Sequence, residues 1–191
     1  MMHRRSATAP VAARLVPGQP IPRATRATEW IELGRALNAE VRARYHLGAS
    51  VHTVAVGWTS VPGLEAQRFV GGSRRVRERS LLPLPTPHID SPRAGALFVD
   101  HAEQDVANAF IDAADAAGLR GDLDGEALWI YVTHARGPCT ACLQGLSNRQ
   151  VAPGVLARLS LRYPGLTVLL TWETARGKLG SLLVQGGQRC N

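Results

Sequence analysis

The chain has 191 residues, of which 45% are hydrophobic, so it is long enough for one domain with a substantial buried core. No apolar run approaches the roughly 20 residues of a membrane-spanning helix, and we expect no membrane-embedded segment. The net charge is +7, and residues 1–99 alone carry +8, which favours a polyanionic partner such as nucleic acid. The alternative is a coding bias, because 21 of the 22 basic residues are arginine.

The first 27 residues contain no acidic side chain and are rich in alanine, arginine and proline. This composition predicts a flexible tail or linker over 1–27, with a single domain over 28–191. Arg4 and Arg5 are followed only by scattered apolar residues that prolines interrupt, which is a poor signal peptide. We therefore expect the protein to act in a cytoplasm.

Hydrophobic periodicity and turn residues predict helices alternating with strands. In chain order they are a helix over 28–45, strands over 51–58 and 67–70, a helix over 101–117, a strand over 128–133, a helix opening at 138–139, a short helix near 156–163, and strands over 166–171 and 179–184. Residues 71–95 contain two consecutive glycines and several prolines, and we expect them to be irregular.

An arginine run lies in this irregular segment, directly before the predicted helix over 101–117. The hypothesis is that its side chains contact nucleic-acid phosphates; the alternative is a solvated charged loop. The arginines concerned are Arg74, Arg75, Arg77 and Arg79.

Two short motifs carry the chemistry. His101 and Glu103 open one predicted helix, and Cys139 and Cys142, three residues apart, open another. An odd number of cysteines that includes a C-x-x-C pair indicates metal or redox chemistry in a reducing compartment. We interpret Cys190, the penultimate residue, as an incidental thiol of the C-terminal tail and not as a metal ligand.

One imidazole and two thiolates suit a zinc ion, and a zinc site with three protein ligands leaves the fourth position for water, whose pKa falls toward about 7. We therefore expect one zinc ion per chain, held by His101, Cys139 and Cys142. Glu103 would accept the water proton and act as general acid and base. The alternative is a closed structural site that takes a second histidine, such as His134, and leaves Glu103 solvated.

His101-Ala102-Glu103 followed by Pro138-Cys139-Thr140-Ala141-Cys142 resembles the cytidine deaminase-like superfamily, in which H-x-E and P-C-x-x-C form the zinc signature. The resemblance implies an α/β fold, a three-layer α/β/α sandwich with a mixed central sheet and both zinc-ligand helices packed on one face. It also implies that the backbone at Ala102, Gly137 and Pro138 grips the pyrimidine. Many relatives have serine where this chain has Gly137.

Tyr163-Pro164 before the strand over 166–171 is similar to the bacterial toxin branch of that superfamily. This resemblance implies hydrolytic deamination of cytosine to uracil in nucleic acid, inside a target cell after delivery as part of a secreted toxin, with an immunity protein as partner. The loop over 171–180 would read the neighbouring nucleotide through Trp172 and Arg176, although Trp172 also suits the core.

We expect a monomer that acts on DNA ahead of RNA, and on single strands ahead of duplex because a single strand requires no base flipping. The alternatives are an enzyme for RNA bases or free nucleosides, attack on adenine in place of cytosine, and a non-catalytic zinc module that only binds nucleic acid. The basic first half of the chain argues against a free-nucleoside substrate, and Glu103 argues against an idle zinc module.

Overall fold

The computed structural model describes residues 19–21, 27–48, 53–90, 101–121, 123–134 and 137–190. Its elements are α1 (Ala27–Arg44), β1 (Val54–Thr59), β2 (Phe69–Gly72), α2 (Arg74–Arg77), α3 (Ala102–Ala116), β3 (Ala127–His134), α4 (Thr140–Leu143), α5 (Val155–Arg162), β4 (Thr167–Thr174), β5 (Leu179–Gln185) and β6 (Gln188–Cys190). Of the helices in these residues, none combines the length and hydropathy that a membrane span requires.

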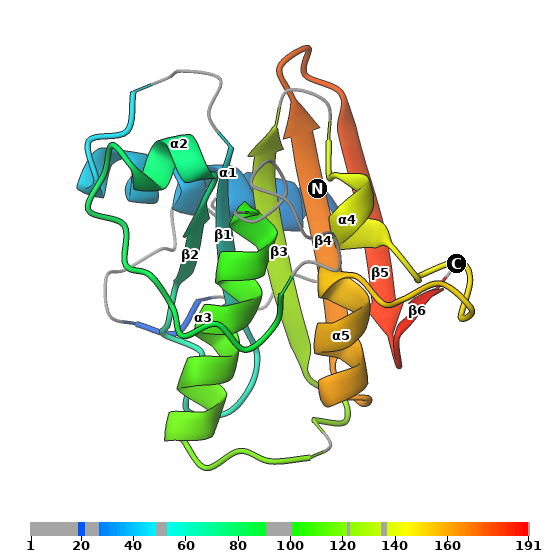
Figure 1. Ribbon diagram of the computed structural model, residues 1–191. Coiled ribbons are helices and arrows are strands. Elements are labelled where there is room, and N and C mark those ends of the chain that lie inside the picture. The colour runs from blue at the N-terminus through cyan, green and yellow to red at the C-terminus, as the bar shows by residue number, and fades with distance from the viewer. Residues whose placement is uncertain are drawn as a thin grey trace, which may run out of the picture.

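The six strands form one mixed sheet in the order β2-β1-β3-β4-β5-β6. The β3–β4 pair is parallel, and every other neighbouring pair is antiparallel. Helix α1 crosses one face of this sheet, and α3, α4 and α5 lie on the other (Figure 1). The predicted α/β class and mixed sheet are therefore confirmed.

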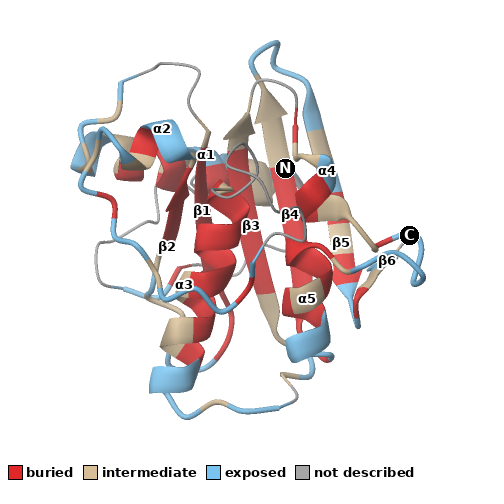
Figure 2. Cartoon of the chain, in the orientation of Figure 1, coloured by how far each residue is buried: buried red, intermediate tan, exposed pale blue. Residues whose placement is uncertain are grey.

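Each face of the sheet has its own apolar core, as the buried residues of Figure 2 show. On the α3 side, the Phe110 ring packs edge-on against both Phe69 and Tyr163, at centroid distances of 5.5 and 5.6 Å. On the α1 side, Trp58 stacks on Trp129 at 6.1 Å, together with the buried leucines of α1. The two cores hold the helices on opposite sides of the sheet.

The predicted helices and strands are present, with three local differences. Residues Arg74–Arg77 form the short helix α2 within the segment expected to be irregular, while residues 78–90 contain no helix or strand. The helix expected at 138–139 is the single turn α4, and β6 was not predicted. Most of the predicted tail lies outside the described residues, but Ile21 is buried and donates its N–H to the Glu65 carbonyl at 2.9 Å.

The proline-rich segment before residue 90 lies along α3. Buried Asn108 accepts hydrogen bonds from the N–H groups of Ile89, at 2.8 Å, and His88, at 3.2 Å. Asp112 accepts from the Thr86 N–H at 2.8 Å and contacts the His88 ring. Helix α3 is therefore covered by the sheet on one side and fixed by this segment on another.

Candidate metal centre

His101 lies at the N-terminal end of α3, as its N-cap residue with extended backbone angles. Its carbonyl accepts the first bonds of the helix, from the N–H groups of Gln104 and Asp105 at 3.0 and 3.1 Å. The apolar residues Val106, Phe110 and Ile111 recur at helical spacing and are buried, so the register of α3 against the sheet is fixed. The imidazole is therefore held at the helix end that faces α4.

Cys139 is the N-cap residue of α4 and accepts a hydrogen bond from the Cys142 N–H at 3.4 Å. The Cys139 sulfur lies 3.1 Å from Nδ1 of His101. Cys142 is fully buried, whereas His101 and Cys139 are half-buried. Two helix ends thus bring the three predicted ligands together.

The donor atoms of His101, Cys139 and Cys142 all lie within 4.8 Å of one another. Zinc–sulfur bonds of about 2.3 Å and zinc–nitrogen bonds of about 2.0 Å at tetrahedral angles place neighbouring donors about 3.5–3.8 Å apart. The three side chains therefore fit a zinc ion with small adjustments. Within the described residues the group has no fourth ligand, and His134 is not part of it.

Glu103 is the second residue of α3 and is almost completely buried, with 3% of its surface exposed. Burial raises its pKa above the ordinary value, and the neighbouring Cys142 thiol and His101 oppose this shift. A carboxyl group with a raised pKa exchanges protons closer to neutral pH, which general acid and base catalysis requires.

The two cysteines differ in protonation. The hydrogen bond from the Cys142 thiol, together with His101, lowers the pKa of Cys139 to about 4 although burial opposes it. The same thiol–thiolate bond and burial raise the pKa of Cys142 well above its usual range. A bound divalent cation would reverse the second shift, because metal ligation deprotonates a thiol.

The first turn of α3 is held by contacts to β2 and α2. A Cβ atom added to Gly71 would lie 1.9 Å from the Ala102 carbonyl oxygen, so the two backbones are in direct contact. Asp105 accepts a bond from the Gly72 N–H at 3.1 Å and pairs with Arg77 at 3.3 Å, with both side chains mostly buried. Sequence reasoning missed Gly71 and Asp105, because neither belongs to a motif.

Three of the residues expected to bind the pyrimidine are neighbours of the metal ligands in the chain. Ala102 is buried at the start of α3, and Gly137 and Pro138 directly precede Cys139. Gly137 has φ 93°, and a Cβ atom there would lie 3.0 Å from Nε1 of Trp172. The half-buried Trp172 ring packs on Gly180 of the neighbouring strand and against the α3-side core, so it supports the Cys139 loop.

No family model, no curated protein and no solved structure matches this chain.

The other predicted contacts are dispersed. Arg176 is exposed in the turn between β4 and β5, which extends beyond the end of the sheet at the top of Figure 1. Arg77 pairs with buried Asp105, and Arg74 pairs with Glu78 at 2.7 Å. Arg75 and Arg79 are exposed on α2 and just after it. Two arginines of the run are therefore paired with carboxylates and two are exposed, and the phosphate contact stays a prediction.

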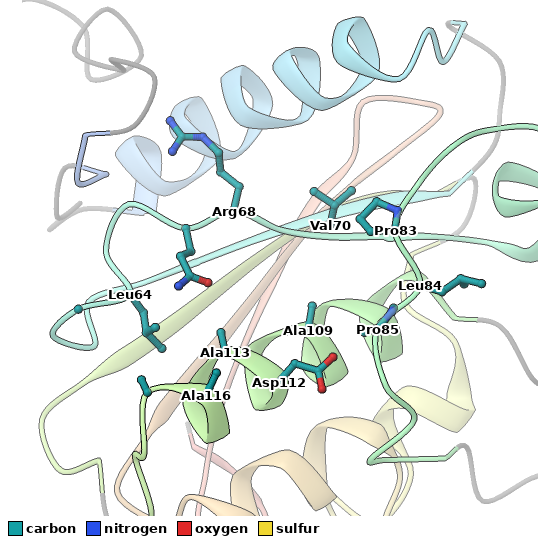
Figure 3. A pocket seen from close by; sticks show the side chains of 13 residues that line it. Leu64, Arg68, Val70, Pro83, Leu84, Pro85, Ala109, Asp112, Ala113 and Ala116 are labelled. Carbon is teal, nitrogen blue, oxygen red and sulfur yellow. The ribbon is translucent and has the colours of Figure 1, made fainter.

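A cavity of about 650 Å³ lies away from His101, Cys139 and Cys142. Figure 3 shows it between the segment around Leu64, the proline-rich segment and the later turns of α3, where Ala109, Ala113 and Ala116 line it. Ala109 lies six residues after Glu103, or about 9 Å along a helix that rises 1.5 Å per residue. This cavity does not reach the metal ligands.

Proposed function

We propose that the protein is a zinc-dependent deaminase that hydrolyses cytosine to uracil in nucleic acid, in DNA ahead of RNA. The observation that carries the proposal is the convergence of His101, Cys139 and Cys142 beside the buried carboxyl group of Glu103. Three ligands suit a catalytic zinc site, because structural sites fill all four positions with protein. The resemblance to the cytidine deaminase-like superfamily, and to its toxin branch, rests on the same residues.

When bound, the zinc ion would supply a water molecule of lowered pKa for attack on C4 of the pyrimidine. In this scheme Glu103 would take a proton from that water and deliver it to the ring nitrogen. It would then carry the proton of the new hydroxyl group on C4 to the amino group, which leaves as ammonia as the C4–N bond breaks. Burial suits this role, since it raises the pKa of the Glu103 carboxyl and so makes the carboxylate a stronger base. The backbone beside Ala102 and Gly137 would hold the pyrimidine edge.

A structural zinc module is the competing proposal, and one arrangement speaks against it. A closed site needs a fourth protein ligand, and none joins the three in the described residues. Such a module also gains nothing from a buried carboxyl group, whose desolvation is unfavourable unless it has a function.

The deciding experiment measures uracil formation in labelled single-stranded and duplex oligonucleotides that contain cytosine after each of the four bases. Glu103→Ala is expected to lower turnover by at least about 100-fold, the usual contribution of a general acid and base. Zinc stoichiometry should stay near one per chain in this variant and fall in Cys139→Ser.

Glu103→Gln is the matched control for packing, because it preserves the side-chain volume and removes the titratable group. Its loss of activity should equal that of Glu103→Ala. The protein could also bind zinc and yet form no uracil in DNA or RNA, convert no adenosine to inosine and turn over no free nucleoside. That result would refute the deaminase proposal and favour the non-catalytic zinc module.

A further inference from the structure

A basic cavity of about 160 Å³ lies between the end of α1 and α2, on the face of the sheet opposite the metal ligands. Its charged and titratable lining residues are Arg42, His46, Arg75 and Arg79. Its remaining lining is apolar or glycine, and no carboxylate lines it among the described residues.

Arg42 forms the rigid part of this cavity. Its guanidinium donates to Oδ1 of Asn38 and to the carbonyl of Gly48, both at 2.9 Å, and to Oγ1 of Thr133 at 3.0 Å. Burial lowers its pKa below the ordinary value, yet a guanidinium remains protonated in proteins. Arg42 is therefore a positive charge fixed in position by three bonds.

Arg75 and Arg79 supply the exposed charges of the cavity. They stand four residues apart, so both project to the same side of the chain around α2. Unlike Arg74 and Arg77, neither forms an ion pair with a carboxylate in the described part of the chain. Three guanidinium groups around one small space repel each other, and an anion between them would relieve this repulsion.

His46 adds a further nitrogen donor from the end of α1. It has φ 53°, the left-handed conformation that ends many helices and that glycine adopts most easily. Its N–H bonds the Ala43 carbonyl at 3.3 Å, and the Leu47 N–H bonds the Arg42 carbonyl at 2.8 Å. These bonds fix the direction in which the imidazole leaves the helix end.

The cavity lies at the end of the sheet from which the chain runs from β3 to Cys139. Val54 lines the cavity and pairs with Thr133 of β3, the residue that Arg42 also contacts. Strand β3 ends at His134, five residues before Cys139. From the other direction, Arg77 in α2 contacts Asp105 in the first turns of α3. Both sites are therefore built on the same end of the sheet.

We propose that this cavity binds a phosphate group of the nucleic-acid strand whose base is presented to the metal centre. Its volume is below the roughly 300–1,000 Å³ of pockets for drug-sized ligands, so it suits a phosphate and not a whole nucleotide. Arginine forks bind phosphate oxygens in pairs of hydrogen bonds. The polymer as the source of the phosphate rests on the proposed function, whereas the anion chemistry does not.

The test compares two double variants in a Glu103→Ala background, so that the substrate is not consumed. Arg75→Gln/Arg79→Gln removes two cavity charges, and Arg120→Gln/Arg149→Gln removes two exposed charges elsewhere. The probe is a fluorescent single-stranded DNA of about 12 nucleotides, within the range of common site sizes. The cavity variant should bind it at least about tenfold more weakly. The slope of log K against log salt should fall by about 0.7 for each phosphate that the variant no longer neutralises.

Inorganic phosphate, compared with chloride at equal ionic strength, tests the anion site without a polymer. Phosphate should raise the melting temperature of the parent and the control but not of the cavity variant. His46→Gly should weaken both responses without lowering the melting temperature in chloride, because glycine accepts the left-handed backbone.

Equal losses in both double variants, or no loss in either, would overturn the site in favour of a diffuse positive field. A phosphate response with unchanged DNA binding would overturn the polymer assignment and leave a site for free phosphate. Since every readout is binding, a chain that fails to deaminate any base still gives an answer, which separates this proposal from the proposed function.

Discussion

Replacing Gly71 with alanine is expected to disturb the metal centre through one methyl group. The added Cβ atom would lie 1.9 Å from the Ala102 carbonyl oxygen, whereas a carbon and a carbonyl oxygen rarely approach closer than about 3.3 Å. Either β2 or the first turn of α3 must therefore move by about 1.4 Å. The obstacle is a backbone atom, so a change of side-chain rotamer does not remove it.

This displacement acts on stability and on the site together. Forcing a methyl group into a packed region costs about 1–3 kcal/mol of unfolding free energy. A metal or catalytic geometry tolerates only about 0.5 Å of displacement. His101 and Glu103 flank Ala102, so zinc affinity should fall by at least about tenfold, a usual effect of disturbing the groups that support metal ligands.

The assay is competition for zinc with a chromogenic chelator, with urea unfolding of the metal-free protein measured alongside. Gly48→Ala is the matched control, because its added Cβ atom meets no atom within 4 Å. Wild-type zinc affinity and an unchanged unfolding free energy in Gly71→Ala would refute the direct contact between β2 and α3.

Two further predictions concern ion pairs. Removing either partner of the mostly buried Arg77–Asp105 pair should lower the free energy of unfolding by about 3–5 kcal/mol. The double variant Arg77→Met/Asp105→Asn should lose less than the sum of the two single losses, measured by urea unfolding of all four proteins in a double-mutant cycle. Additive losses would mean that the two side chains do not interact. The second concerns Glu173, whose pKa is lowered by its hydrogen bond from Arg35. A lowered folded-state pKa gives stability that is present above the ordinary value of 4.5 and is lost as the pH falls through the lowered value. Because Arg35 is 48% exposed, this contribution to the unfolding free energy should stay below about 1 kcal/mol. Glu173→Gln should therefore lower the unfolding free energy at pH near 7 but not at pH near 3. An equal loss at both pH values would mean that the charge of Glu173 is not the cause.

The sequence predicted most helices and strands because their hydrophobic periodicity is local. It did not predict α2, whose four residues begin after Ser73 and bury only Val76, too little for a periodic signal. It overestimated α4, which ends at Leu143, two residues before Gly145 adopts φ 82°. Short elements of this kind are decided by their neighbours in space, which periodicity does not record.

The three candidate metal ligands were predictable because two sequence motifs contain them, but the residues that support them were not. Asp105 reads as an ordinary acidic residue on a helix, and its bonds to Gly72 and Arg77 join residues about 30 positions apart. The arginine run looks uniform in sequence, yet one helical turn gives its members different environments. Arg74 faces Glu78, Arg77 faces Asp105, and the other two line the basic cavity.

The brevity of α4 does not weaken the site, because the ligands depend on helix starts and not on helix lengths. His101 and Cys139 are both N-cap residues, and Cys142 follows within the first turn of α4. The unpaired N–H groups of a first turn stabilise a thiolate, as the 3.4 Å bond from the Cys142 N–H to the Cys139 sulfur illustrates. One turn therefore suffices for the C-x-x-C half of the site. The longer α3 is needed for a different reason, since its buried face must hold His101 and Glu103 against the sheet.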